Sequence, residues 1–90
     1  MVTNQKMMQL TIDVPETVFP TLQKDKGEFT RELRIAAAVK WYEMARVSQG
    51  RAAEIAGLTR GEFITVLGQY NVSPFQYTAD EVLEELANAD

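Results

Sequence analysis

The sequence predicts a mainly α-helical single domain over residues 1–90, in which an N-terminal β-strand precedes a small helical domain with a helix-turn-helix and a C-terminal helix. Three observations lead to this fold class. Apolar and polar residues alternate over residues 7–14, apolar residues recur at helical spacing over residues 28–46, and residues 48–70 carry a helix-turn-helix pattern. An extended segment and an acidic helix over residues 72–90 complete the expected fold.

The composition limits what kind of protein this chain can be. Its 90 residues, 46% hydrophobic and 24% charged, suit one globular domain with a modest core. No cysteine or histidine occurs, which removes thiolate nucleophiles, imidazole bases and the usual zinc ligands. We therefore expect no enzyme, no metal or other cofactor and no small-molecule substrate. No segment approaches the roughly 18 apolar residues that span a bilayer, so we expect a cytoplasmic protein without membrane contact.

Charge is distributed unevenly along the chain, whose net charge is −4. Residues 30–60 hold six basic and three acidic groups, whereas residues 61–90 hold six acidic groups and no Lys or Arg. A basic middle is thus followed by an acidic tail. This distribution is more informative than the net charge, which alone argues against a general nucleic-acid coat.

The first expected element is a strand with one buried face. Its alternating apolar residues are Met8, Leu10, Ile12 and Val14. Pro15 ends it, and no second strand of similar strength follows. A single strand needs a partner, which is either the same strand of a second copy, in a ribbon across a homodimer axis, or the extended stretch from Val72 to Tyr77. The sequence leaves both pairings open, and the first makes these four apolar residues the dimer contacts.

After a polar connection over Gln23–Gly27, residues 28–46 form the longest expected helix. Its main apolar stripe contains Phe29, Leu33, Ala36, Ala37, Trp41 and Met44. Four further residues widen that stripe: Ile35, Ala38, Val39 and Tyr42. Such a broad apolar surface predicts a position in the centre of the core. The spacing of Trp41 within the stripe predicts a core or interface residue.

The helix-turn-helix pattern begins at Ser48, a good N-cap for its first helix. Ala53 lets a second helix approach closely, and Gly57 suits a turn that needs positive φ. Thr59 and Glu62 form a capping box at the start of the second helix. Leu58 is expected in the angle between the helices, and the facing apolar residues are Ala52, Ala56, Phe63 and Val66. The second helix is expected to end near Tyr70, with Asn71 in the left-handed conformation.

The sequence resembles a family of small, uncharacterised prokaryotic proteins that are commonly regarded as antitoxins. The resemblance lies in the order and spacing of four blocks: residues 10–15, 31–43, 48–68 and 72–86. The resemblance covers nearly the whole chain. It implies a neighbouring gene for a toxin-like ribonuclease of the PIN-domain type. It also implies binding of operator DNA through the helix-turn-helix, in a complex that regulates its own transcription.

The start and outward face of the second helix of a helix-turn-helix enter the major groove. The base-reading candidates are therefore Thr59, Arg60, Gly61, Ile64 and Thr65. Arg60 is the strongest, because Arg pairs bidentately with guanine O6 and N7. Arg46, Gln49 and Arg51 are placed to meet phosphates. A monomer with one base-reading Arg would bind weakly, whereas a dimer doubles the basic residues.

The acidic C-terminal helix has two interpretations. It is either a solvated helix, as acidic terminal helices usually are, or a surface that covers a basic toxin. The second interpretation makes the toxin-binding residues Tyr77, Asp80, Glu81, Val82, Glu84, Glu85 and Leu86. The predicted function is thus an antitoxin that binds a PIN-type toxin and operator DNA. The alternative is a protein-interaction or dimerisation module in which the helix-turn-helix only packs.

Overall fold

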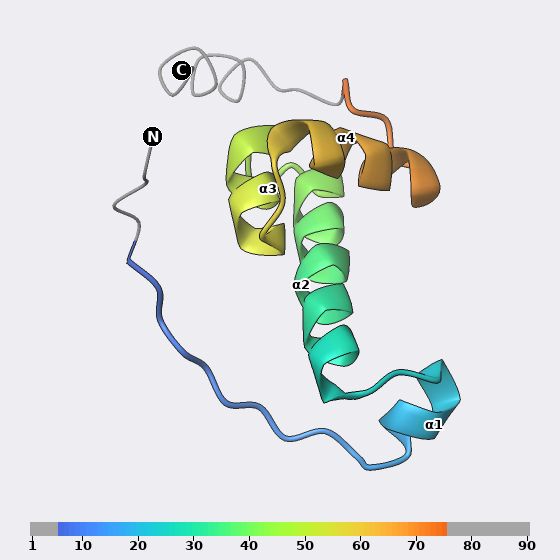
Figure 1. The fold of residues 1–90 in the computed structure, drawn as a ribbon. Helices are drawn as coiled ribbons and strands as arrows, with labels where there is room; N and C mark the ends of the chain where they lie inside the picture. The colour runs from blue at the N-terminus through green and yellow to red at the C-terminus, as the bar shows by residue number, and fades with distance from the viewer. Residues whose placement is uncertain (1–5, 76–90) are drawn as a thin grey trace.

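The computed structural model describes residues 6–75, and this part of the chain is mainly helical, as predicted. Its four helices are α1 (Val18–Leu22), α2 (Lys26–Glu43), α3 (Gln49–Ala56) and α4 (Arg60–Gln69). The long helix α2 runs through the middle of the molecule, α3 packs beside its C-terminal half, and α4 packs on α3 (Figure 1). Within residues 6–75, no helix is long and apolar enough to cross a membrane.

Helix α2 begins at a capping box that the sequence analysis missed. Asp25 Oδ1 accepts a hydrogen bond from the backbone N–H of Glu28 (2.8 Å), and Glu28 Oε1 accepts one from the N–H of Asp25 (3.0 Å). These reciprocal bonds satisfy two donors that a helix start leaves without partners. The helix therefore begins at Lys26, inside the stretch that was expected to be a polar connection.

Helices α2, α3 and α4 end in the same way. One or two residues after each helix ends, a residue takes left-handed backbone angles, with φ of 59° at Ala45, 72° at Gly57 and 58° at Asn71. The next residue then donates a hydrogen bond back into the last turn: Arg46 to Trp41 (2.9 Å), Leu58 to Ala53 (3.0 Å) and Val72 to Leu67 (2.9 Å). This is the Schellman motif. It confirms the predicted conformations of Gly57 and Asn71, and it ends α2 before residue 46.

The face of α2 that packs against the other helices is formed by residues that were predicted to widen the apolar stripe, and not by the main stripe itself. Ala38, Val39 and Tyr42 are buried, whereas Trp41 is 39% exposed and Met44 53% exposed. The prediction of a buried stripe through Trp41 was therefore wrong. The core between α2 and α3 contains small residues from both helices, Ala38 on α2 and Ala52 and Ala53 on α3, which allows the helices to approach closely.

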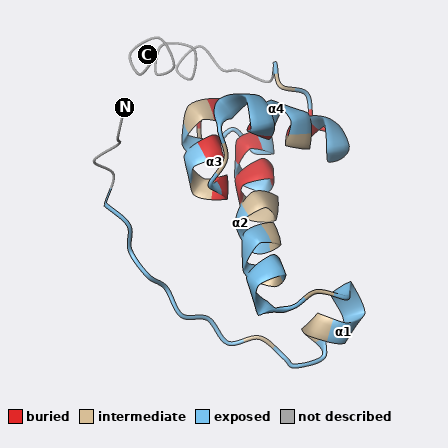
Figure 2. Ribbon diagram, viewed as in Figure 1, coloured by how far each residue is buried: buried red, intermediate tan, exposed pale blue. Residues whose placement is uncertain are grey.

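The core lies where the C-terminal half of α2 meets α3 and α4, and Figure 2 shows the buried residues gathered there. The rings of Tyr42 and Phe63 meet edge to face at its centre, with centroids 6.0 Å apart. Leu67 is fully buried, whereas Val66, the expected facing residue, is only partly buried. The buried apolar residues are Ala38, Val39, Tyr42, Ala52, Ala53, Ala56, Phe63, Leu67 and Val72.

The strand expected over residues 7–14 is absent, and residues 6–75 contain no strand at all. Met8, Leu10 and Ile12 are 84%, 80% and 56% exposed on an irregular segment that runs beside the helices (Figure 1). A strand forms only with a hydrogen-bonded neighbour, and the single chain offers none here. The alternative pairing with residues 72–77 also fails over its described part, residues 72–75. Pairing with a second copy stays a prediction.

Residues 72–75 close over the helical core instead of forming a strand. Val72 is buried, and the carbonyl oxygen of Pro74 accepts hydrogen bonds from Tyr42 Oη (2.8 Å) and Gln49 Nε2 (3.0 Å). This segment therefore belongs to the helical core. The predicted C-terminal acidic helix lies outside the described residues.

Helix α1 is short and contains no buried residue. Its contact with α2 is the ring pair of Phe19 and Phe29, whose centroids lie 5.6 Å apart at 76°. The segment therefore meets the start of α2, at the opposite end from the core (Figure 2).

Candidate nucleic-acid interface

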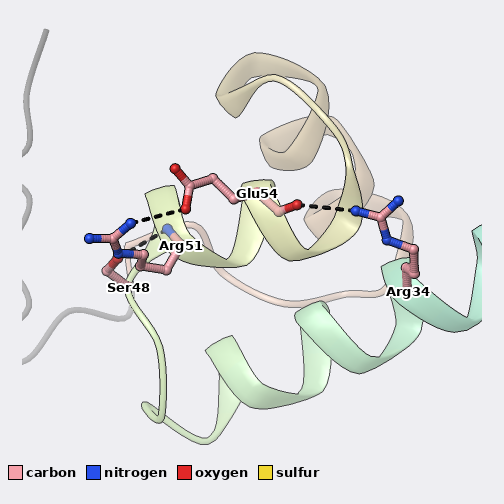
Figure 3. A network of polar contacts seen from close by, with 4 residues as sticks. All are labelled: Arg34, Ser48, Arg51 and Glu54. Atoms are coloured by element: carbon pink, nitrogen blue, oxygen red, sulfur yellow. Dashed lines mark hydrogen bonds and ion pairs between the residues drawn. The ribbon is translucent and has the colours of Figure 1, made fainter. Parts of the chain in front are cut away.

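The turn between α3 and α4 is held by an arginine from α2. Arg34 donates from Nε to the carbonyl oxygen of Ile55 (2.8 Å) and from Nη2 to that of Glu54 (3.4 Å). Figure 3 shows its guanidinium beside this end of α3, where carbonyls lack partners within the helix. A Cβ added to Gly57 would lie 3.2 Å from Nη1 of Arg34. Gly57 is therefore needed for its positive φ and for the room it leaves Arg34.

The start of α3 has the predicted cap. Ser48 Oγ accepts a hydrogen bond from the backbone N–H of Arg51 (3.1 Å). The side chain of Arg51 forms an exposed ion pair with Glu54, with Nη1 and Oε1 3.1 Å apart (Figure 3). Exposed pairs of this kind contribute only about 0–1 kcal/mol, so a phosphate can compete for the guanidinium. Phosphate contact by Arg51 stays a prediction.

The start of α4 has the predicted capping box. Thr59 Oγ1 accepts from the N–H of Glu62 (3.1 Å), and Glu62 Oε1 accepts from the N–H of Thr59 (2.9 Å). The backbone hydrogen bond from Thr59, followed by its side-chain hydrogen bond, lowers the pKa of Glu62 from its ordinary value of 4.5. The carboxylate therefore stays ionised and is held at the helix start by its hydrogen bonds to Thr59.

Seven of the eight predicted DNA-contacting residues are exposed. They are Arg46, Arg51, Thr59, Arg60, Gly61, Ile64 and Thr65. On α4 they form an accessible surface: Ile64 is 41% exposed, and nothing lies within 4 Å of the Cβ position at Gly61. The hydroxyl of Thr65 donates to the carbonyl oxygen of Gly61 (3.3 Å), so its donor is engaged within the helix. An apolar contact with a thymine methyl suits both Ile64 and Thr65.

Gln49 is the exception, because only 2% of its surface is exposed. Its burial contradicts the expected phosphate contact. The Oε1 atom of Gln49 accepts a hydrogen bond from Nε of Arg60 (2.9 Å), and its Nε2 donates to the carbonyl oxygen of Pro74 (3.0 Å). Gln49 therefore joins the start of α3 to the start of α4 and does not face outward.

Two hydrogen-bonding roles that shape this surface were missed by sequence reasoning. Arg34 is 21 positions from the carbonyl it caps, and Tyr42 is 32 positions from Pro74. Contacts over such separations leave no local pattern in the sequence. The predicted toxin-binding residues, from Tyr77 to Leu86, lie outside the described residues.

The described part of the chain is thus a small helical protein in which α3, the turn of Gly57, Leu58 and Thr59, and α4 have the organisation of a helix-turn-helix. Residues 7–90 match the uncharacterised protein family UPF0175, and the chain belongs to this family.

Two relatives from Aeropyrum pernix are both named UPF0175 protein. One is 35% identical over 78 residues, which are 87% of this chain and 82% of the relative. The other is 35% identical over 60 residues, which are 67% of this chain and 76% of the relative. No solved structure shows a significant match to the chain.

Proposed function

We propose that this protein is the antitoxin of a type II toxin-antitoxin system, which binds operator DNA through α3 and α4 and neutralises a PIN-type ribonuclease toxin. The observation that carries the DNA-binding part is the exposed Arg60 at the first position of α4, held by Gln49 beside the open surface at Gly61. This is the part of a helix-turn-helix that enters the major groove, where Arg discriminates guanine.

The residues around Arg60 support the same proposal. Arg46 and Arg51 are exposed near the entrance of α3, where they would meet phosphates and set the orientation on the duplex. Glu62, the nearest acidic group on α4, is engaged in its cap. A protein with these contacts would act on DNA in the cytoplasm, as a binding protein and not as an enzyme.

One copy of this interface carries few cations, so the proposal includes a homodimer. The exposed residues Met8, Leu10 and Ile12, with the half-buried Val14, would pair with the same segment of a second copy. Pairing would supply the hydrogen-bonded neighbour that the single chain lacks and would cover its apolar face. Two copies of α4 would then read half-sites about 34–36 Å apart.

The toxin-binding part rests on the resemblance and on the sequence of residues 76–90. This stretch has acidic and apolar residues and no basic one, which suits a surface that covers the basic RNA-binding site of a ribonuclease. The same composition separates it from the basic middle of the chain. The two activities would therefore use different parts of the protein.

A gel-shift experiment with the protein's own promoter tests the DNA-binding part. Wild type should shift this fragment in preference to a scrambled fragment, and Arg60→Ala should abolish the preference. Lys40→Ala is the matched control, because it removes one exposed positive charge from α2, away from the interface. The proposal fails if wild type does not bind at low salt, or if Arg60→Ala binds the promoter as wild type does.

Co-expression with the product of the neighbouring gene tests the toxin-binding part. Neutralising the four acidic candidates Asp80, Glu81, Glu84 and Glu85 to their amides in the full chain should abolish protection from the toxin while leaving promoter binding intact. If this variant still protects cells, the toxin binds elsewhere. A neighbouring gene that does not encode a PIN-type protein would contradict the choice of toxin.

The second candidate function is a protein-interaction module whose helix-turn-helix only packs. The exposed stripe of Leu33, Trp41 and Met44 on α2 favours it, because these three large apolar residues are 40%, 39% and 53% exposed. Trp41→Ala separates the candidates. It should leave promoter binding unchanged if α3 and α4 bind DNA, and it should abolish partner binding if the stripe is the functional surface.

A further inference from the structure

Gln49 has a buried polar side chain that forms hydrogen bonds with two different residues. It occupies the first position of α3, it is 2% exposed, and both ends of its amide are hydrogen-bonded. A buried amide costs free energy unless its partners are well placed, so a residue of this kind fixes the groups that it touches. One of those groups is Arg60, the leading candidate for reading a base.

The orientation of the Gln49 amide follows from the chemistry of its partners. Nε of Arg60 only donates, so it must face Oε1, and the carbonyl oxygen of Pro74 only accepts, so it must face Nε2. Exchanging the two ends of the amide would place donor against donor and acceptor against acceptor. The amide therefore has one orientation.

Pro74 is itself held in place, which makes it a firm anchor. Its carbonyl oxygen also accepts from Tyr42 Oη at 2.8 Å, and Tyr42 is fully buried in α2. The neighbouring Val72 is buried in the core. A chain of hydrogen bonds thus runs from α2 through Pro74 and Gln49 to Arg60 at the surface.

We propose that Gln49 is a positioning residue that holds the guanidinium of Arg60 in the orientation needed to discriminate a guanine. This inference rests on the proposed DNA-binding function and deepens it by naming the residue that sets its specificity. An Arg side chain has many rotamers, and ordering it on binding costs entropy. Holding Nε before DNA arrives reduces that cost.

The first test requires no DNA. The Nε–Hε group of Arg60 gives its own signal in nitrogen-15 NMR spectra of the full chain, and its hydrogen exchange should be slowed by Gln49. Gln49→Met keeps the size of the side chain and removes both hydrogen bonds, so exchange should accelerate about tenfold. Gln49→Glu keeps the acceptor for Arg60 and should restore most of the protection. Unchanged exchange in Gln49→Met would overturn the proposal.

The second test is a double-mutant cycle on binding to the promoter fragment. Gln49→Met should weaken binding to the promoter about tenfold relative to the scrambled fragment, which is within the range of one bidentate base contact. In the Arg60→Ala background the same substitution should have no further effect. If Gln49→Met weakens binding equally in both backgrounds, Gln49 does not act through Arg60 and the proposal is wrong.

Ser48→Ala is the matched control for lost stability. Ser48 is buried beside Gln49 at the same end of α3, and its hydroxyl caps the helix without touching Arg60. This variant should lower the melting temperature yet leave both the Arg60 signal and promoter discrimination unchanged. If wild type does not bind the promoter, the proposed DNA-binding function fails. The hydrogen exchange of the Arg60 Nε–Hε group still decides, in that case, whether Gln49 holds the Arg60 side chain.

Discussion

The two halves of the described chain differ in how they are stabilised. Between residues 6 and 75, every buried residue falls between Ala38 and Val72, and residues 6–37 contain none. The second half builds a core from two rings, several alanines and three Schellman turns. The first half also carries large apolar residues, and six of them are exposed: Met7, Met8, Leu10, Ile12, Leu22 and Leu33. Apart from α2, whose Arg34 holds the turn between α3 and α4, the first half therefore contributes little to folding of the single chain. Its exposed apolar residues are available for contact with another molecule.

The largest expected effect is at Phe63, in the centre of the core. Phe63→Ala should cost about 3–5 kcal/mol and unfold much of this small domain. Leu10→Ala, in the exposed segment, should change the free energy of unfolding by no more than about 0.5 kcal/mol at a protein concentration too low for dimers. Urea denaturation measures both. Comparable losses at the two sites would show that the contrast between the halves is wrong.

The next effect concerns two glycines of the helix-turn-helix. Gly57→Ala should cost about 2 kcal/mol, because the residue has φ of +72° and a Cβ would meet Arg34. Gly61→Ala lies on α4 in open space and should instead stabilise the protein by about 0.5–1 kcal/mol. Thermal denaturation of the pair provides the test. Equal effects would contradict the proposed role of the Arg34 contact and of the turn.

A smaller gain is expected at Ala45, which ends α2 with φ of +59°. Ala45→Gly removes the strain of a Cβ in the left-handed region and should stabilise the core half by about 0.5–1 kcal/mol. The shift in the urea midpoint measures this gain. A loss of stability would mean that the end of α2 has other backbone angles in solution.

The smallest expected effect is the pH dependence at Glu62. Its pKa is lower in the folded protein than its ordinary value of 4.5, so the unfolded state binds the proton more readily. The contribution of the carboxylate is therefore present above pH 4.5 and is lost as the pH falls through the lowered pKa. Stability measured on both sides of pH 4.5 should fall less on acidification in Glu62→Gln than in wild type.

Local signals in the sequence were sufficient to predict where α3 and α4 begin and end. Ser48, Gly57 and Asn71 each act within a few residues of their own position, through a cap or a left-handed angle. The capping box of Asp25 and Glu28 is also a local pattern, and it could have been found in the same way. Gly27 lies inside the first turn of α2, and its presence led to the prediction that residues 23–27 form a polar connection.

Contacts between distant residues were beyond such reasoning. The apolar residues of α2 extend over more than one face. Their spacing therefore did not show that α3 packs against the face with Tyr42 and not against the face with Trp41. The alternation over residues 7–14 indicated a strand, but a strand also needs a neighbour, which a pattern within one segment cannot supply. The role of Gln49 depends on Arg60 and Pro74, which are distant in sequence but both lie within hydrogen-bonding distance of its side chain.

The most direct test of the DNA-binding claim is to map where the protein meets its promoter. Backbone NMR signals of the nitrogen-15-labelled full chain should be followed as the promoter fragment is added. We predict that the largest changes fall on Arg51 and on residues 59–65, with little change in residues 16–30. Changes confined to residues 7–14, as for a β-ribbon that reads DNA, or no changes at low salt, would contradict the account.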